Sequence, residues 1–150
     1  MQILRNDICD KTATQICKIQ RETLFENSDV NSVKTSVKSG VLFFVEFDDL
    51  KNVVCFCSVM PIDKEWEIYD IATVYEYQNR GFAKKTIGKI LDFAAKNGAQ
   101  NLFLEVRESN EKAITLYSKF GFEKYAVRKN YYANNGESAV CMKKTVKNIL

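Results

Sequence analysis

The stretch from Ile68 to Asn97 constrains the fold most strongly, because its hydrophobic pattern changes period within a few residues. Residues 68–74 are rich in β-branched and aromatic side chains and contain neither proline nor glycine, which is typical of a strand that enters a core. Residues 82–97 then place apolar side chains on one helical face and most charges away from it, before Gly98 supplies a stop. The sequence therefore predicts a strand, a short loop and an amphipathic helix in succession.

The loop at residues 78–83 has the composition of a phosphate-binding turn. Small residues such as Gly81 allow a ligand to approach the backbone, and the first N–H groups of the following helix point outward together. A helix start of this kind binds anionic phosphate well. Neither the G-x-G-x-x-G pattern of dinucleotide-binding proteins nor the G-x-x-x-x-G-K-[ST] pattern of P-loops is present. A nucleotide-containing cofactor of another class is therefore favoured.

The rest of the chain predicts one α/β domain that covers residues 1–150, with a mixed sheet and flanking helices. Asp10 is expected to cap the first helix, and residues 61–65 are expected to form a turn. The strand at 102–106 follows helix 82–97, an order that makes neighbouring strands parallel. Further strands are predicted at 1–4, 41–47, 53–60, 122–127 and 139–142, and further helices at 10–24, 28–39 and 110–120.

The composition excludes several classes of protein. With 22 basic and 19 acidic residues the net charge is only +3, too weak to indicate a nucleic acid or a membrane surface as the main partner. The first residues lack the continuous apolar core of a signal peptide, and the longest strongly apolar run, residues 41–45, is too short to span a bilayer. A cytoplasmic location is the resulting expectation.

Cysteine and histidine usage narrows the chemistry further. The five cysteines include no C-x-x-C pair and four of them lie in apolar segments, so we expect reduced thiols in the core. The chain contains no histidine, which excludes histidine-based catalytic triads and histidine-ligated zinc sites. No metal is expected.

Several segments resemble one family. The Q-x-x-G-x-A pattern at residues 78–83 resembles the [QR]-x-x-G-x-[GA] segment of the GNAT acetyltransferase superfamily. LEVRESNEKAITLYSKFGF at 104–122 and RKNYYANNGESAVCM at 128–142 resemble its RimI-like branch, and the resemblance covers residues 67–142. It implies the GNAT fold, a mixed and centrally splayed sheet flanked by helices. It also implies transfer of an acetyl group from acetyl-CoA to the N-terminal alanine of a small-subunit ribosomal protein.

The resemblance also assigns the residues that would hold acetyl-CoA. The amide-rich pantetheine arm would bind the backbone of one strand edge as an added strand, and a backbone amide there would polarise the thioester carbonyl. That edge comprises Ile71, Ala72 and Thr73. The residues that would surround the pyrophosphate are Asn79, Arg80, Gly81, Phe82, Ala83 and Lys84. The alternative for Arg80 and Lys84 is that they lie on a solvated helix face and bind no cofactor. The resemblance assigns Asn110 to the CoA arm, and the sequence pattern also predicts Asn110 as a helix N-cap.

Two residues are candidates for the chemistry of acetyl transfer. Glu105 lies within an apolar run, where desolvation disfavours the charged carboxylate and so favours proton acceptance, directly or through water. Tyr117 lies on the inward face of helix 110–120 and could protonate the departing thiolate. The resemblance assigns these residues the roles of general base and general acid. The alternatives are an exposed strand glutamate and a tyrosine that fills space in the core.

The acceptor is predicted to be a primary amine. A free α-amino group titrates near ~8 and a lysine near ~10.4, so a carboxylate base deprotonates the α-amine more easily. Tyr131, Tyr132 and Glu137 suit a peptide with a positive N-terminus, although a solvated hairpin explains them as well. Ser138 stands where the family usually has Asp, which weakens this assignment. A small amine or lysine acceptor and a non-catalytic acyl-CoA-binding module are the alternatives.

Overall fold

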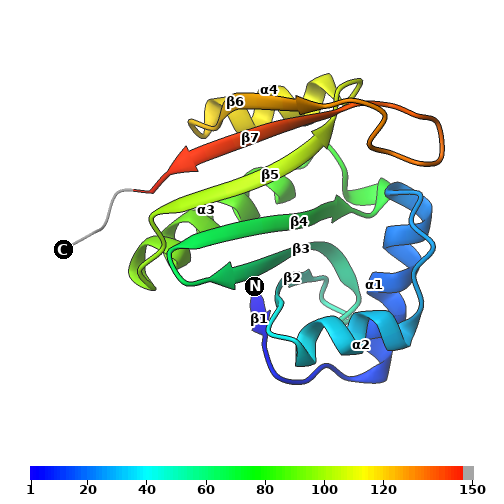
Figure 1. The fold of residues 1–150 in the computed structure, drawn as a ribbon. Helices are drawn as coiled ribbons and strands as arrows, with labels where there is room; N and C mark the ends of the chain where they lie inside the picture. Colours follow the sequence, from blue (N-terminus) through cyan, green and yellow to red (C-terminus); the bar gives the residue numbers. More distant parts are fainter. Residues whose placement is uncertain (147–150) are drawn as a thin grey trace. The chain divides into compact units, whose positions relative to one another are not determined.

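The computed structural model of the chain describes residues 1–146 and contains a seven-stranded mixed sheet (Figure 1). The strands are β1 (Gln2–Leu4), β2 (Leu42–Phe47), β3 (Val53–Ile62), β4 (Glu65–Thr73), β5 (Asn101–Arg107), β6 (Glu123–Arg128) and β7 (Ala139–Thr145). The helices are α1 (Asp10–Thr23), α2 (Val30–Lys38), α3 (Phe82–Lys96), α4 (Glu111–Lys119) and the short 3-10 helix η1 (Tyr75–Tyr77). The strand order is β1-β2-β3-β4-β5-β7-β6. This arrangement confirms the predicted α/β class.

The chain forms two compact units. The first comprises residues 1–61 and 69–90, and the second comprises residues 62–68 together with those from Leu91 onward. Strand β4 and helix α3 each contribute residues to both units. The single domain expected from the sequence stays a prediction.

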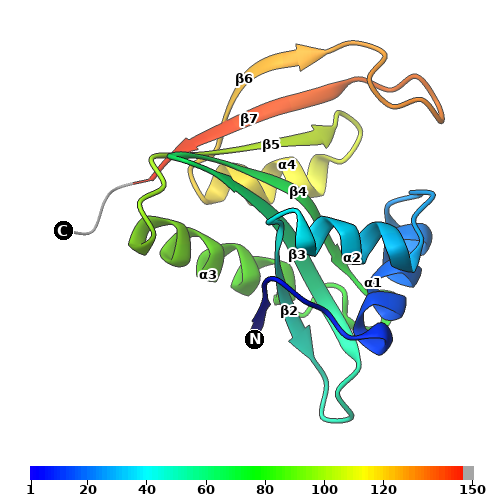
Figure 2. The same ribbon diagram turned by 60° about the horizontal axis from the view of Figure 1, so that its bottom comes forward.

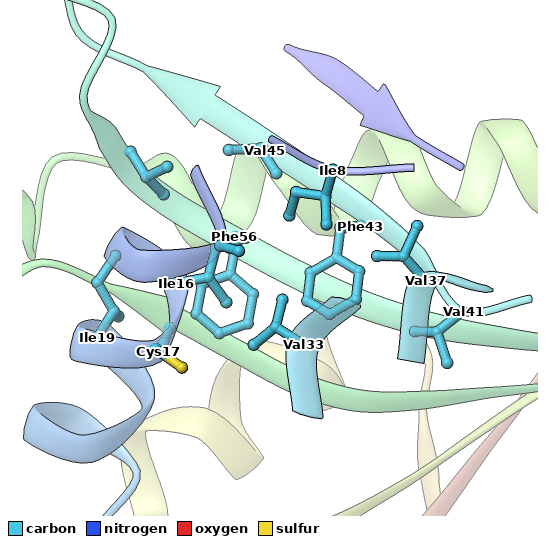
Figure 3. Packing of buried hydrophobic residues seen from close by; sticks show 13 residues of the cluster. Ile8, Ile16, Cys17, Ile19, Val33, Val37, Val41, Phe43, Val45 and Phe56 are labelled. Atoms are coloured by element: carbon cyan, nitrogen blue, oxygen red, sulfur yellow. The ribbon is translucent and has the colours of Figure 1, made fainter. Parts of the chain in front are cut away.

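The first unit holds an apolar core between its strands and the helices α1 and α2 (Figure 3). Strands β1, β2 and β3 pair antiparallel. Ile16 from α1 and Val33 from α2 point toward Phe43 and Phe56, whose rings stack with centroids 6.1 Å apart. The apolar residues of both helices recur at helical spacing, so each helix presents one buried stripe to this cluster.

The second unit is built on β5. Residues Glu65–Ile68 of β4 pair with β5 in parallel, whereas β7 pairs antiparallel with both β5 and β6 (Figure 2). Along β5, Leu102 and Leu104 are buried while Phe103 and Glu105 are only partly covered. This alternation places Glu105 on the more open face of the strand.

Two local predictions need correction. Asp10 is not the N-cap of α1, because Cys9 occupies that position and Asp10 lies in the first turn. The turn predicted at residues 61–65 is shorter, since β3 continues through Pro61 and β4 already begins at Glu65. Proline lacks an N–H and is tolerated in a strand where none is needed for the ladder. The reversal instead uses Asp63, whose φ of 50° lies in the left-handed region.

Candidate active site

The loop before α3 has the backbone conformation of a tight turn. Asn79 and Gly81 have φ values of 61° and 83°. A side chain at Gly81 would be strained by this φ although no atom lies within 4 Å of an added Cβ. The N–H of Lys85 donates to the carbonyl of Gly81 at 3.0 Å, so the amides of residues 82–84 precede the first helical hydrogen bond. This geometry fits a phosphate group.

Side chains of the same loop hold its shape. The amide of Gln78 donates to the carbonyl oxygen of Thr73 at 3.0 Å and thus ties the loop to the end of β4. The rings of Tyr77 and Phe82 meet edge to face at 5.7 Å, and the guanidinium of Arg80 lies 5.1 Å from the Tyr77 centroid. In the sequence Gln78 was only the first residue of the Q-x-x-G-x-A pattern and had no assigned role. In the structure its side chain anchors the loop to the end of β4.

The three residues assigned to the pantetheine arm lie at the end of β4, after the segment that pairs with β5. The hydroxyl of Thr73 donates to Sγ of Cys55 at 3.4 Å. Burial raises the pKa of the Cys55 and Cys57 thiols, so both are poor nucleophiles. None of the five cysteines is bridged: Cys17, Cys55, Cys57 and Cys141 are buried, as expected, whereas Cys9 is exposed.

Glu105 is held by two donors within the second unit. Its carboxylate accepts from Nε of Arg128 at 3.0 Å, and the Glu105 and Arg128 side chains are 17% and 60% exposed. The Tyr131 hydroxyl also donates to this carboxylate, which raises the pKa of Tyr131 to about 12. The structure thus brings together the predicted base and one predicted substrate residue. No role in the site was assigned to Arg128 from the sequence. The only indication of one was its position shortly before Tyr131 and Tyr132.

A second carboxylate faces Glu105. In the parallel ladder Glu67 pairs with Phe103, so Glu105 lies two residues farther along β5 on the same face. Burial raises the pKa of Glu67, and the negative charge of Glu105 raises it further. This proximity depends on strand register, which the sequence pattern did not reveal.

The loop between β6 and β7 is closed by Glu137 and Arg107. The Glu137 carboxylate accepts from the Ser109 amide at 2.7 Å and from Arg107 at 3.4 Å. The Arg107 guanidinium lies 3.9 Å from the centroid of Tyr132, whose ring is 5.1 Å from that of Tyr131. Glu137 thereby fixes the loop that carries both tyrosines. Its predicted contact with substrate stays a prediction.

The contacts of Glu137 predict an acid-sensitive loop. Hydrogen bonds from Ser109 lower the pKa of Glu137 to about 2, below its ordinary 4.5. Its stabilisation of the fold is therefore complete above about pH 4.5 and is lost as the pH falls toward 2. We expect the Ser109 amide NMR signal to shift with a midpoint near pH 2, and Glu137→Gln to abolish that step. A midpoint near 4.5 would show that the carboxylate does not make these contacts in solution.

The remaining predicted residues lie on or beside α4. Tyr117 is 5% exposed, and its ring packs against Phe122 at 5.8 Å with an interplanar angle of 64°. The side chain of Asn110 accepts from the Ala113 amide at 3.2 Å, which confirms the predicted N-cap. Asn110 and Tyr117 belong to the second unit with Glu105, whereas the loop at 79–84 belongs to the first.

Similarity to known proteins identifies the family. Residues 11–122 match the acetyltransferase (GNAT) family. This chain belongs to the GNAT family. A crystal structure of the ribosomal-protein-S18-alanine N-acetyltransferase of Escherichia coli has the same fold, with a TM-score of 0.86 and 23% identity over 99% of this chain and 96% of that chain.

Several curated relatives are named as bS18-alanine N-acetyltransferases. The chain is 33% identical over 115 residues to the bS18-alanine N-acetyltransferase of Escherichia coli, covering 74% of this chain and 78% of that protein. It is 39% identical over 94 residues to the Haemophilus influenzae enzyme of the same name, covering 61% of this chain and 64% of that protein. Another alignment, to an uncharacterized Mycobacterium leprae protein, spans only 21% of that relative. The chain thus spans less than two thirds of the length of the Haemophilus influenzae and Mycobacterium leprae proteins.

Residues 1–146 contain neither a membrane-spanning helix nor a cluster of metal ligands. No helix in this part of the chain has the length and apolarity needed to cross a membrane. In the same residues no three side chains of the acidic, cysteine or histidine types are grouped so as to hold a metal ion.

Proposed function

We propose that this chain transfers the acetyl group of acetyl-CoA to a primary amine, preferably the N-terminal α-amine of a ribosomal protein. Membership of the GNAT family and the names of the relatives support the reaction class. The observation that carries the assignment is Glu105, an accessible carboxylate held by Arg128 and Tyr131 on the open face of β5. A cytoplasmic location is part of the proposal. So are acetyl-CoA and a primary amine as partners, with neither a nucleic acid nor a membrane among them.

The proposal gives each part of the structure a chemical role. The amides at the start of α3, with Asn79, Arg80 and Lys84 around them, bind the pyrophosphate, and the backbone of residues 71–73 binds the pantetheine arm. Asn110 contacts the same arm. Bound acetyl-CoA supplies an electrophilic thioester carbonyl. Glu105 removes a proton from the ammonium, and the amine attacks the carbonyl carbon. Tyr117 protonates the departing thiolate, and the second proton that the nitrogen loses restores the Tyr117 phenol, directly or through water, which leaves a neutral amide and free coenzyme A.

In this scheme the Arg128 guanidinium occupies the position beside Glu105 that the ammonium group of the acceptor would take. This guanidinium is more than half exposed and pairs with Glu105 at the surface. An ion pair with one partner this exposed contributes little to stability, so an incoming ammonium can displace the guanidinium. Tyr131 and Tyr132, held in place through Arg107 and Glu137, then line the path of the acceptor peptide.

An acetylation assay tests the proposed function. Peptides with a free N-terminal alanine should gain one acetyl group in the presence of acetyl-CoA, with release of one thiol, whereas N-terminally blocked peptides should not. Preferred acetylation of polyamines or of lysine side chains would move the assignment to a small-amine or lysine acetyltransferase. Heat of acetyl-CoA binding without thiol release for any amine would indicate a non-catalytic binding module. Absence of binding to both coenzyme A and acetyl-CoA would refute the proposal.

Tyr117→Phe tests the general acid. We expect kcat to fall by about 100-fold because the ring keeps its packing against Phe122 while the proton donor is lost. The Kd of acetyl-CoA should change little. Steady-state kinetics with calorimetry separates the two effects, and Tyr125→Phe on the exposed strand β6 provides the matched control. An unchanged kcat in Tyr117→Phe would remove Tyr117 from the mechanism.

A further inference from the structure

A row of polar side chains crosses strands β2, β3 and β4 of the first unit. Phe43 and Phe56 point into the core under α1 and α2, so the side chains next to them along β2 and β3 point to the opposite face of the sheet. On that face Glu46 lies directly opposite Cys55 in the antiparallel ladder. The Thr73 hydroxyl extends the row to β4, because it donates to Sγ of Cys55 at 3.4 Å.

Helix α3 covers this row with two polar side chains. Thr86 and Lys89 are three residues apart and therefore lie on one face of the helix. Nζ of Lys89 donates to the Glu46 carboxylate at 3.1 Å. Oγ1 of Thr86 and Sγ of Cys55, which belong to residues that are both 0% exposed, share a hydrogen bond of 3.8 Å. A buried polar group without a bond is costly, so these contacts restrict how α3 can turn or slide on the strands.

Cys55 connects the two segments that the proposed function assigns to acetyl-CoA. Thr73 is the last residue of β4 and ends the strand edge assigned to the pantetheine arm. Helix α3 begins at Phe82 with the amides assigned to the pyrophosphate, and Thr86 lies about one turn after that start. The Cys55 thiol contacts both Thr73 and Thr86. One buried sulfur atom therefore links the strand edge to the helix that carries the phosphate-binding turn.

We propose that Cys55 is a positioning residue: its thiol holds the end of β4 and the start of α3 at the separation that acetyl-CoA spans between its pantetheine arm and its pyrophosphate. Cys55 is fully buried, so it acts through Thr73 and Thr86 and not on the cofactor itself. A ligand with two linked parts gains affinity from the link only when both subsites stand at the matching distance. The inference deepens the proposed function and rests on it, because the spacing matters for acetyl-CoA as a whole and not for either half.

The experiment compares acetyl-CoA with its two halves on the intact chain. Phosphoadenosine diphosphate ends at the pyrophosphate, and S-acetylpantetheine carries the pantetheine arm. Calorimetry gives the Kd of acetyl-CoA, and NMR titration of the Thr73 and Gly81 amide signals gives the Kd of each half. Cys55→Ala should weaken acetyl-CoA binding about tenfold, which corresponds to the loss of one buried hydrogen bond. Each half should bind to this variant within about twofold of its Kd for the unaltered chain.

Cys57→Ala is the matched control. Cys57 lies two residues farther along β3, is also 0% exposed, and contacts the Ser58 carbonyl with its Sγ at 3.9 Å. The substitution removes the same atom at the same depth and leaves the contacts of Cys55 in place. The Kd of acetyl-CoA should therefore stay within about twofold.

Two further variants keep the test decisive if Cys55→Ala folds poorly. Cys55→Ser retains a group that can bond both threonines, so its loss of acetyl-CoA affinity should be less than about threefold. Thr86→Val removes the hydroxyl on the helix side at nearly constant shape and should weaken acetyl-CoA binding about tenfold. Adding Cys55→Ala to Thr86→Val should cause no further loss, because both substitutions remove the same contact.

Three outcomes decide against the inference. Parallel weakening of acetyl-CoA and of both halves, or equal losses in Cys55→Ala and Cys57→Ala, would show that the thiol fills the core and would overturn the proposal. Unchanged acetyl-CoA binding in both Cys55→Ala and Thr86→Val overturns it as well, while the proposed function stands. An unaltered chain that binds neither coenzyme A nor acetyl-CoA refutes the proposed function, and the inference falls with it.

Discussion

Replacing Glu105 by Gln is expected to lower kcat for acetyl transfer by about 10²- to 10⁴-fold, the range typical for loss of a general base. Gln keeps the shape of the side chain and can still accept hydrogen bonds from Arg128 and Tyr131, but it cannot take a proton. The Kd of acetyl-CoA should be preserved. Stopped-time measurements of thiol release at saturating peptide and acetyl-CoA give kcat directly.

The control for this experiment is Glu123→Gln, because Glu123 is an exposed carboxylate on strand β6 of the same unit. It should leave kcat within twofold. The pH profile adds a second readout, since activity in Glu105→Gln should lose the dependence that the base imposes. If Glu105→Gln retains full turnover with an unchanged pH profile, the carboxylate only positions Arg128 and Tyr131, and another group must accept the proton.

The elements of the fold could be predicted from the sequence because their hydrophobic periods are strong. The apolar stripe of residues 82–97 and the apolar run at 102–106 correspond to α3 and β5 within two residues at each end. Their order also predicted the parallel pairing of β4 with β5, which is confirmed. The ends were less predictable, because proline at 61 suggested a turn where the strand continues.

The contacts around the candidate base could not be predicted in the same way. Arg128 reaches Glu105 because β7 lies between β6 and β5, an order that hydrophobic periodicity does not specify. Glu67 faces Glu105 only because the parallel register pairs it with Phe103. The pairing of Glu26 with Asp70 joins the loop after α1 to β4 across a long sequence separation. Each contact depends on how distant segments pair, and local sequence patterns do not specify that pairing.

Phe56→Ala is expected to lower the free energy of unfolding by about 3–5 kcal/mol, the usual cost of truncating a fully buried phenylalanine. The Phe56 side chain is 0% exposed and stacks on Phe43 in the core under α1 and α2. Truncation removes this contact and leaves a void that the neighbouring strands cannot close.

Chemical denaturation measures the loss, with Leu50→Ala as the control because Leu50 is 78% exposed in the turn between β2 and β3. That control should change the free energy by less than about 0.5 kcal/mol. A loss of stability below about 1 kcal/mol would mean that the core rearranges to fill the gap.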